Sequence, residues 1–278
     1  MFVPGNNERM IRKASQLSPD SVIVDLEDAV PENQKEEARR LILNLLPNLD
    51  WGGKELCVRI NPLYSPHFYR DIVLVSGLDV VDCIVVPKAE GDLGFLHKAT
   101  GKKLEPMVET PRGFLRIEDI VRSEGVVAVT YGLGDLAHYL GGKVEAYEGN
   151  DYVRTAIVMA ARAYGVDPVD RVFFDVRNLD AFRKDCIEAK AMGFVGKQVI
   201  HPDQVVIANE VFSPSPEELE WARRVVEAYE RAVKEGRGAI ELNGELIDAM
   251  HYRMAKDLLS KFGSPTHTKD KSSSMNSQ

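Results

Sequence analysis

Two carboxylates near the middle of the chain follow apolar runs, in positions where they could bind a metal ion. Glu109 follows Pro106-Met107-Val108, and Asp135 follows the run from Val126 to Gly134. We expect these runs to be consecutive strands. Neighbouring strands lie about 5 Å apart, so both side chains can reach one hard cation. Oxygen ligands favour Mg²⁺, and the sequence has no His and Cys cluster that would favour a softer metal. A salt bridge to a neighbouring Arg or Lys is the structural alternative.

An arginine ends an earlier apolar run and is suited to binding a carboxylate. Arg59 follows Cys57-Val58. Its planar guanidinium can donate two parallel hydrogen bonds to a carboxylate, whereas a lysine offers only a point charge. We therefore predict that Arg59 binds the substrate and takes part in catalysis. Pairing with Asp25 or Glu27 is the competing structural interpretation.

Three carboxylates fall within four residues at the end of another apolar run, Asp25-Leu26-Glu27-Asp28. We predict that Glu27 and Asp28 face the substrate and order bound water, and that Asp25 orients Arg59. Lys88, at the end of Ile84-Val85-Val86-Pro87, is predicted to balance this negative charge or to contact the substrate. We do not expect Lys88 to form a Schiff base, because a metal ion would already stabilise an enolate.

The elements that would position these residues alternate between strands and helices. Short β-branched runs separated by helix-like segments recur about eight times, as in a (β/α)8 TIM barrel, an α/β fold of roughly 250 residues. The expected strands are residues 2–3, 21–26, 55–60, 83–87, 103–109, 126–131, 171–176 and 194–200, with a long loop after residue 131. In such a barrel the carboxyl ends of the strands share one mouth, where the charged residues would meet. We place the barrel over residues 1–212.

The pattern changes after the barrel, and residues 213–262 are predicted to form a helical lid or arm. Residues 215–235 have apolar side chains at helical spacing, and a glycine-rich break, 236–238, follows them. A second helix is expected over 244–262 and contains Asp248. The Ser/Thr/Lys-rich tail, 263–278, is expected to be disordered.

Composition and charge exclude several classes of protein. The net charge of −8 argues against a general nucleic-acid-binding surface, and no apolar stretch approaches the roughly 20 residues that span a membrane. The three cysteines, Cys57, Cys83 and Cys186, are widely spaced, without the spacing of zinc ligands, and we expect them to be reduced thiols in the core. The first residues lack the pattern of a signal peptide, and we predict a cytoplasmic location.

Several motifs together resemble the citrate lyase beta-subunit-like family. This family belongs to the HpcH/HpaI aldolase superfamily and includes malyl-, citramalyl- and citryl-CoA lyases. The similarity covers about residues 1–260 and follows the family's order. The motifs are Phe2-Val3-Pro4-Gly5, Asp25-Leu26-Glu27-Asp28-Ala29-Val30, Val58-Arg59-Ile60-Asn61, Pro87-Lys88, Val108-Glu109-Thr110, Gly134-Asp135-Leu136, Gly193-Phe194-Val195-Gly196-Lys197, Ile200-His201-Pro202 and Gly244-Glu245-Leu246-Ile247-Asp248.

The resemblance implies roles for these residues. It implies that Mg²⁺ is held at Glu109 and Asp135, that Glu109 also contacts the substrate, and that Arg59 binds the carboxylate or carbonyl oxygens of a 2-oxo acid. An aspartate of the lid, which matches Asp248, can reach a neighbouring subunit's site in these lyases, and we predict that Asp248 is the acid/base residue. The resemblance also implies a homotrimer, or a hexamer built from trimers.

The implied activity is that of a Mg²⁺-dependent carbon–carbon lyase. It would reversibly cleave a citryl-, malyl- or citramalyl-type 3-hydroxyacyl-CoA into acetyl-CoA and a 2-oxo acid, with an acyl carrier protein as the alternative thioester handle. Hydrolysis of the thioester is a conceivable side activity. Two other readings remain: a CoA-independent, metal-dependent aldolase of 4-hydroxy-2-oxo acids, and a non-catalytic subunit that binds an acyl carrier. The complete set of Arg59, Glu109, Asp135 and Asp248 argues against the non-catalytic subunit.

Overall fold

The computed structural model describes residues 1–148 and 150–262. The chain forms two compact units, one of residues Met1–Phe212 and one that begins at Ser213. The predicted disordered tail, 263–278, lies outside the described residues. None of the helices in the described part is both long and apolar enough to cross a membrane.

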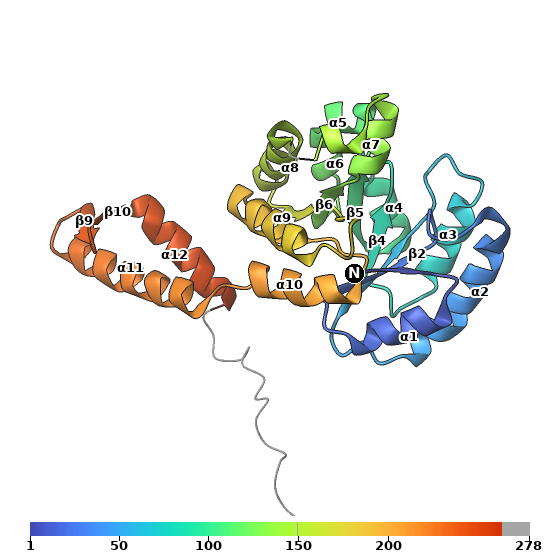
Figure 1. The fold of residues 1–278 in the computed structure, drawn as a ribbon, viewed down its shortest axis with the longest axis horizontal. Coiled ribbons are helices and arrows are strands. Elements are labelled where there is room, and N and C mark those ends of the chain that lie inside the picture. Colours follow the sequence, from blue (N-terminus) through green and yellow to red (C-terminus); the bar gives the residue numbers. More distant parts are fainter. Residues whose placement is uncertain (149, 263–278) are drawn as a thin grey trace, which may run out of the picture. The chain divides into compact units, whose positions relative to one another are not determined.

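The first unit is a barrel of eight parallel strands that pair in chain order. A hydrogen bond of 2.9 Å from the Phe2 N–H to the Val199 carbonyl joins the first strand to the segment that follows the eighth. The predicted TIM-barrel fold is therefore confirmed (Figure 1). The strands are β1 (Phe2–Pro4), β2 (Ser21–Asp25), β3 (Glu55–Arg59), β4 (Cys83–Val86), β5 (Lys103–Val108), β6 (Ala128–Tyr131), β7 (Asp167–Asp170) and β8 (Gly196–Lys197).

Strand residues alternate between two separate apolar clusters. Val22, Val24 and Val58 belong to a large cluster that the strands form with the surrounding helices. The alternate residues, such as Ile23 and Cys57, form a small cluster of their own with Cys83, Val85, Met107 and Phe2. Successive side chains of a strand point to opposite faces, so the small cluster is the inside of the barrel.

Helices follow most of the strands, and several begin with an asparagine whose side chain accepts a backbone N–H. These caps are Asn7, Asn150 and Asn178. The helices are α1 (Glu8–Gln16), α2 (Lys35–Leu45), α3 (Phe68–Ser76), α4 (Gly94–Thr100), α5 (Pro111–Leu115), α6 (Ile117–Val121), α7 (Leu133–Tyr139), α8 (Asp151–Ala163), α9 (Leu179–Met192) and α10 (Pro202–Phe212).

The seventh strand is not where the sequence predicts it. The apolar run 171–176 is not a strand, and the strand is instead Asp167–Asp170, which contains a proline and two aspartates. Its polarity is balanced by tertiary partners, because buried Asp170 forms ion pairs with Lys197 and Arg154. The long loop expected after residue 131 is also wrong, since α7 begins at Leu133.

The second unit consists of two helices and a hairpin around a core of its own. The helix α11 (Pro216–Lys234) begins with a capping box of Ser215 and Glu218. The predicted helix over 244–262 begins only at Ala249, as α12 (Ala249–Phe262), and the preceding residues form the hairpin of β9 (Ala239–Leu242) and β10 (Glu245–Asp248). Its loop, Asn243-Gly244, has both residues in the left-handed region, which is the strongest short sequence signal for a hairpin.

Candidate active site

A cavity of about 320 Å³ lies at the carboxyl ends of the strands. Arg59 is the last residue of β3 and Glu109 follows β5 directly, as predicted for strand ends. Asp135 also lines the cavity but differs from its prediction, because it lies in the first turn of α7 instead of at the end of a strand. The predicted residues that line the cavity are Asp25, Asp28, Arg59, Glu109 and Asp135, and the predicted Glu27 and Lys88 contact them without lining it.

Arg59 is held by two carboxylates of the acidic run. Its Nε and Nη2 atoms donate to the two carboxylate oxygens of Asp25 at 2.7 and 2.6 Å, and its Nη1 lies 3.2 Å from Glu27 Oε2. The ring of Phe2 lies under the guanidinium, 5.0 Å from Cζ to the ring centroid. Burial opposes the ionisation of Asp25, but the charge and hydrogen bonds of Arg59 outweigh it and lower the pKa of Asp25. The pair is thus charged, and the guanidinium has a fixed orientation.

Lys88 connects the other carboxylates. Its Nζ lies 2.6 Å from Glu27 Oε1, 3.5 Å from Asp135 Oδ1 and 3.9 Å from Asp28 Oδ2. Its backbone N–H donates to Glu109 Oε2 at 2.9 Å, with the backbone in the left-handed region at φ 50°. Such a conformation is uncommon for a residue with a side chain. In this protein, the residue with this conformation, Lys88, is also the one whose N–H positions Glu109.

Glu109 is almost completely buried, and its environment disfavours the charged form. Burial and, to a smaller extent, the nearby charge of Glu27 raise the pKa of Glu109 to about 7, against the opposing effect of Lys88 and Arg59. The pKa of Glu27 is also raised, first of all by burial. Within the described part of the chain, Glu27 Oε2 has no hydrogen-bond donor in good geometry. Buried carboxylates that lack sufficient compensation are stabilised by a bound cation.

The balance of charge and the type of donor both fit a hard divalent cation. Five carboxylates meet around two cationic side chains. The carboxylates offer only oxygen atoms as metal ligands, and Mg²⁺ prefers oxygen ligands. These residues are Asp25, Glu27, Asp28, Glu109 and Asp135, with Arg59 and Lys88.

Gly132 creates the space in which Glu109 lies. A Cβ atom at Gly132 would lie 2.2 Å from Glu109 Oε1 and 2.7 Å from its Cγ. The glycine is therefore required by this close approach and not by its backbone angles, since φ is −108° and ψ is 104°. The predicted site does not include Phe2, whose ring lies under Arg59, although its place in the first strand indicates a side chain that points inward.

Asp248 belongs to the second unit, at the end of β10. Its Oδ1 accepts from the N–H of Met250 at 2.9 Å and lies 2.8 Å from Nδ1 of His251. The hydrogen bond with the His251 side chain is the main reason that the pKa of Asp248 is lowered. The carboxylate is therefore ionised at neutral pH.

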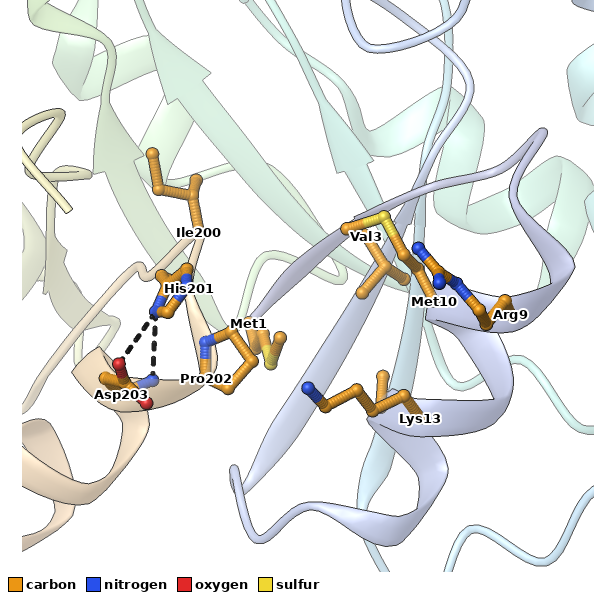
Figure 2. Close-up of a pocket in the computed structure, with 10 residues that line it drawn as sticks. Met1, Val3, Arg9, Met10, Lys13, Ile200, His201, Pro202 and Asp203 are labelled. Carbon is orange, nitrogen blue, oxygen red and sulfur yellow. Dashed lines mark hydrogen bonds and ion pairs between the residues drawn. The ribbon is translucent and has the colours of Figure 1, made fainter.

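A second cavity, of about 410 Å³, shares the residue Ile200 with the first. It lies between α1 and the start of α10 and has an apolar floor that includes Met1 and Val3 (Figure 2). Arg9 and Lys13 of α1 line the side opposite His201. Arg9 and Lys13 bring two positive charges to this cavity, which could bind a phosphate group, and the carboxylate of Asp203 lines the side of His201.

Comparison with known proteins identifies similar chains along nearly the whole length. A family model described as HpcH/HpaI aldolase/citrate lyase matches residues 1–93 and 99–202. The mitochondrial citramalyl-CoA lyase of Rattus norvegicus is 34% identical over 284 residues, which cover 93% of this chain and 84% of the relative. A (3S)-malyl-CoA thioesterase of Cereibacter sphaeroides is 34% identical over 268 residues and covers 94% and 93%. The structure of CitE from Mycobacterium tuberculosis in complex with magnesium, acetoacetate and coenzyme A superimposes with a TM-score of 0.79 at 29% identity, covering 95% of this chain and 97% of that one.

Proposed function

The chain belongs to the HpcH/HpaI aldolase/citrate lyase family, and we propose how its barrel carries out the chemistry of that family. It is a Mg²⁺-dependent carbon–carbon lyase that reversibly cleaves a citryl-, malyl- or citramalyl-type 3-hydroxyacyl-CoA into acetyl-CoA and a 2-oxo acid. The observation that supports our assignment of the residues is the presence of Glu109, Asp135 and Arg59 around one cavity.

Glu109 and Asp135 would hold the Mg²⁺. Glu109 is kept against the backbone of Gly132, and Asp135 is partly exposed beside it in the same cavity. When bound, the ion supplies Lewis-acid polarisation of the carbonyl of a 2-oxo acid. Glu27, Asp28 and Lys88 surround this position and would fix the substrate and its water molecules.

Arg59 would bind the carboxylate and the reacting oxygen of the substrate. Two of its five N–H groups are used by Asp25, which leaves others for the cavity. A guanidinium held in advance stabilises the negative charge that develops on an alkoxide. In cleavage, the hydroxyl of the substrate would lose its proton to solvent water, the electron pair of the broken carbon–carbon bond would pass to the thioester enolate, and the oxygen would become the carbonyl of the 2-oxo acid.

Asp248 would move the proton at the thioester carbon. In the synthetic direction its ionised carboxylate takes a proton from the methyl group of acetyl-CoA, and the resulting enolate attacks the 2-oxo acid. In cleavage the carboxyl would deliver a proton that it takes up from solvent water to the enolate carbon. We propose that the second unit brings Asp248 to the barrel of a neighbouring subunit in a homotrimer or in a hexamer of trimers.

Mixing two inactive variants tests this sharing of residues between subunits. Asp248→Asn and Glu109→Gln should each be inactive alone. Refolded or coexpressed together, they should regain part of the activity, because one subunit supplies Glu109 and the other Asp248. If the mixture stays inactive although mixed oligomers form, the site is complete within one chain.

The second cavity would bind the phosphate groups of the carrier that holds the acyl group as a thioester, either CoA or an acyl carrier protein. Arg9 and Lys13 are exposed and cationic, and the cavity adjoins the carboxylates through Ile200. A variant with Arg9→Glu and Lys13→Glu should raise the KM for the CoA thioester and leave kcat close to that of the native protein. Replacing CoA by an acyl carrier protein as the substrate would show which handle is preferred.

The decisive experiment is condensation in the synthetic direction. The protein is incubated with Mg²⁺, acetyl-CoA and glyoxylate, pyruvate or oxaloacetate, and the products are identified by mass spectrometry, with EDTA as control. An EDTA-sensitive acyl-CoA adduct that disappears in Glu109→Gln supports the proposal and identifies the acid. Release of free CoA and a hydroxy acid would instead indicate the thioesterase activity that the Cereibacter relative carries in its name.

The absence of any adduct would contradict the proposed use of CoA. A CoA-free aldolase would then cleave a 4-hydroxy-2-oxo acid under the same conditions, and a non-catalytic subunit would do neither. We also propose a cytoplasmic location, since the three cysteines are free and buried, as is typical of a reducing compartment. Cell fractionation and the mass of the oligomer in solution would test the location and the assembly.

A further inference from the structure

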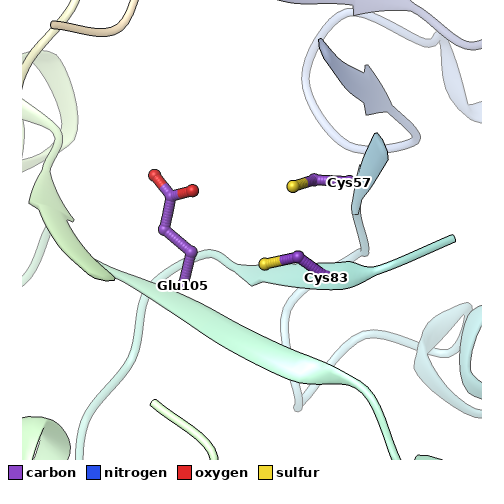
Figure 3. Close-up of side chains that lie close together, drawn as sticks. All are labelled: Cys57, Cys83 and Glu105. Atoms are coloured by element: carbon purple, nitrogen blue, oxygen red, sulfur yellow. The ribbon is translucent and has the colours of Figure 1, made fainter. Parts of the chain in front are cut away.

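Two cysteines and a glutamate meet inside the barrel, away from the carboxyl ends of the strands. Cys57, Cys83 and Glu105 come from β3, β4 and β5, and their candidate ligand atoms all lie within 4.8 Å of one another. Figure 3 shows the three side chains pointing toward a common space. All three are buried, and Cys57 and Cys83 are register partners on neighbouring strands.

The position of this cluster differs from that of the Mg²⁺ site. Cys83 is the first residue of β4, and Glu105 lies four residues before Glu109 along β5. Residues of a strand two apart share a face, so Glu105, Met107 and Glu109 all point inward, with Met107 between the two carboxylates. Met107 packs with both cysteines in the inner cluster.

The donor set suits a thiophilic cation better than Mg²⁺. Zinc binds Cys sulfur at about 2.3 Å and carboxylate oxygen at about 2.0–2.2 Å in a tetrahedral arrangement, which places neighbouring ligand atoms roughly 3.5 to 3.8 Å apart. The ligand atoms of the three residues lie up to 4.8 Å apart, so the side chains would have to approach one another by about 1 Å to bind the ion. The Ser21 hydroxyl, 3.4 Å from Cys57 Sγ, lies at the edge of the same space and could hold a water molecule as fourth ligand.

Neighbouring groups already orient the glutamate. Gln198 donates from Nε2 to Glu105 Oε1 at 2.9 Å, as groups around metal sites commonly do for a coordinating carboxylate. Among the ion pairs of the described residues, none joins Glu105 to a lysine or arginine side chain. The positive group near Glu105 and Cys57 is the N-terminal ammonium of Met1, whose pKa burial lowers to about 6, and a cation bound by the cluster would supply a positive charge that does not depend on pH in this way.

We propose that Cys57, Cys83 and Glu105 form a site for a thiophilic divalent cation of the Zn²⁺ class, separate from the Mg²⁺ site. Sequence spacing alone gives no sign of this site, because the cysteines are 26 residues apart, from position 57 to position 83. The pairing of β3 with β4 brings them together.

Titration of the full-length, reduced and metal-free protein with Co²⁺ tests the proposal. Cobalt bound by thiolates gives a sulfur-to-metal charge-transfer absorption, which oxygen ligands at the Mg²⁺ site cannot produce. We expect one Co²⁺ per chain with this absorption, and its loss on addition of Zn²⁺. Cys57→Ala and Cys83→Ala should lack the absorption, whereas Cys186→Ala, which removes the buried cysteine on α9, should retain it.

The conservative variant Glu105→Gln tests the site separately from any folding defect of the cysteine variants. It preserves the size of the side chain and should weaken Co²⁺ and Zn²⁺ binding by roughly 10-fold or more. The proposal is overturned if the folded native protein shows no thiolate absorption, if Glu105→Gln binds as tightly as the native protein, or if Cys186→Ala loses the signal. A Cys57–Cys83 disulfide in the isolated protein would overturn it as well.

Discussion

Replacing Gly132 by alanine should lower the activity of the enzyme strongly by displacing one carboxylate. The new Cβ would lie 2.2 Å from Glu109 Oε1, 2.7 Å from Cγ and 2.8 Å from Cδ. Ordinary contacts between such atoms are about 3.5 Å, so the carboxylate must move by about 1 Å. The backbone angles of Gly132 are open to alanine, and the strain therefore falls on Glu109 and not on the main chain.

The size of the effect follows from the surroundings of Glu109. Its side chain is buried and its Oε2 accepts the Lys88 N–H at 2.9 Å, so a shift also breaks this hydrogen bond. A displacement of about 1 Å in a catalytic site can cost on the order of 100-fold in rate, or about 2.7 kcal/mol of transition-state stabilisation. We expect a loss of this size in kcat/KM, together with weaker Mg²⁺ binding.

The assay is kcat/KM for thioester cleavage as a function of Mg²⁺, with calorimetric measurement of Mg²⁺ binding. Gly134→Ala is the matched control, because a Cβ there meets nothing closer than Phe174 Cζ at 3.8 Å. Both variants should unfold close to the native temperature. The reasoning is refuted if folded Gly132→Ala keeps nearly native kcat/KM, or if Gly134→Ala loses as much activity.

Three further predictions concern buried ion pairs. Asp170→Asn should lower the free energy of unfolding by about 3 kcal/mol in urea titrations, because it removes one of the two carboxylates that pair with both Lys197 and Arg154 and leaves Asp185 as their shared partner. Burial opposes the ionisation of Asp170, but these cations outweigh it and hold its pKa below the usual 3.8, so its contribution is present above that pH and lost on acidification. Stability measured from pH 5 downward should therefore fall less steeply in Asp170→Asn than in the native protein, and equal slopes would contradict this. Arg59→Lys keeps the charge but loses the paired hydrogen bonds to Asp25, and we expect kcat/KM to fall by roughly 10-fold or more, or about 1.4 kcal/mol, in the cleavage assay. Unchanged kinetics would show that a point charge suffices.

The strands that could be predicted are those whose own residues are apolar. β2 and β4 are largely β-branched runs, and β3 and β5 contain the apolar residues that precede Arg59 and Glu109. β7 could not be recognised in this way, since buried Asp170 at its end is stabilised by Tyr131, Lys197 and Arg154, which are distant in sequence.

Some features of the candidate site were not predicted, because they depend on tertiary structure or on a sequence signal of only two residues. Asp135 lies in a helix that begins two residues after β6, and an apolar run does not distinguish a strand end from such a turn. The second strand of the hairpin, β10, falls in the segment predicted as helix, although Asn243-Gly244 signals a hairpin at this position. The cluster around Cys57 required the register of the barrel, which spacing does not reveal.

Closure of the barrel has a consequence for synthesis on the ribosome. The first strand receives its last neighbour only through the hydrogen bond from Phe2 to Val199. At about 5–20 residues per second, the chain spends many seconds with β1 as an open sheet edge. Open edges favour pairing with other chains. Nascent chains that stall before Val199 should therefore be the aggregation-prone species, and chaperones should be needed most before this residue leaves the ribosome.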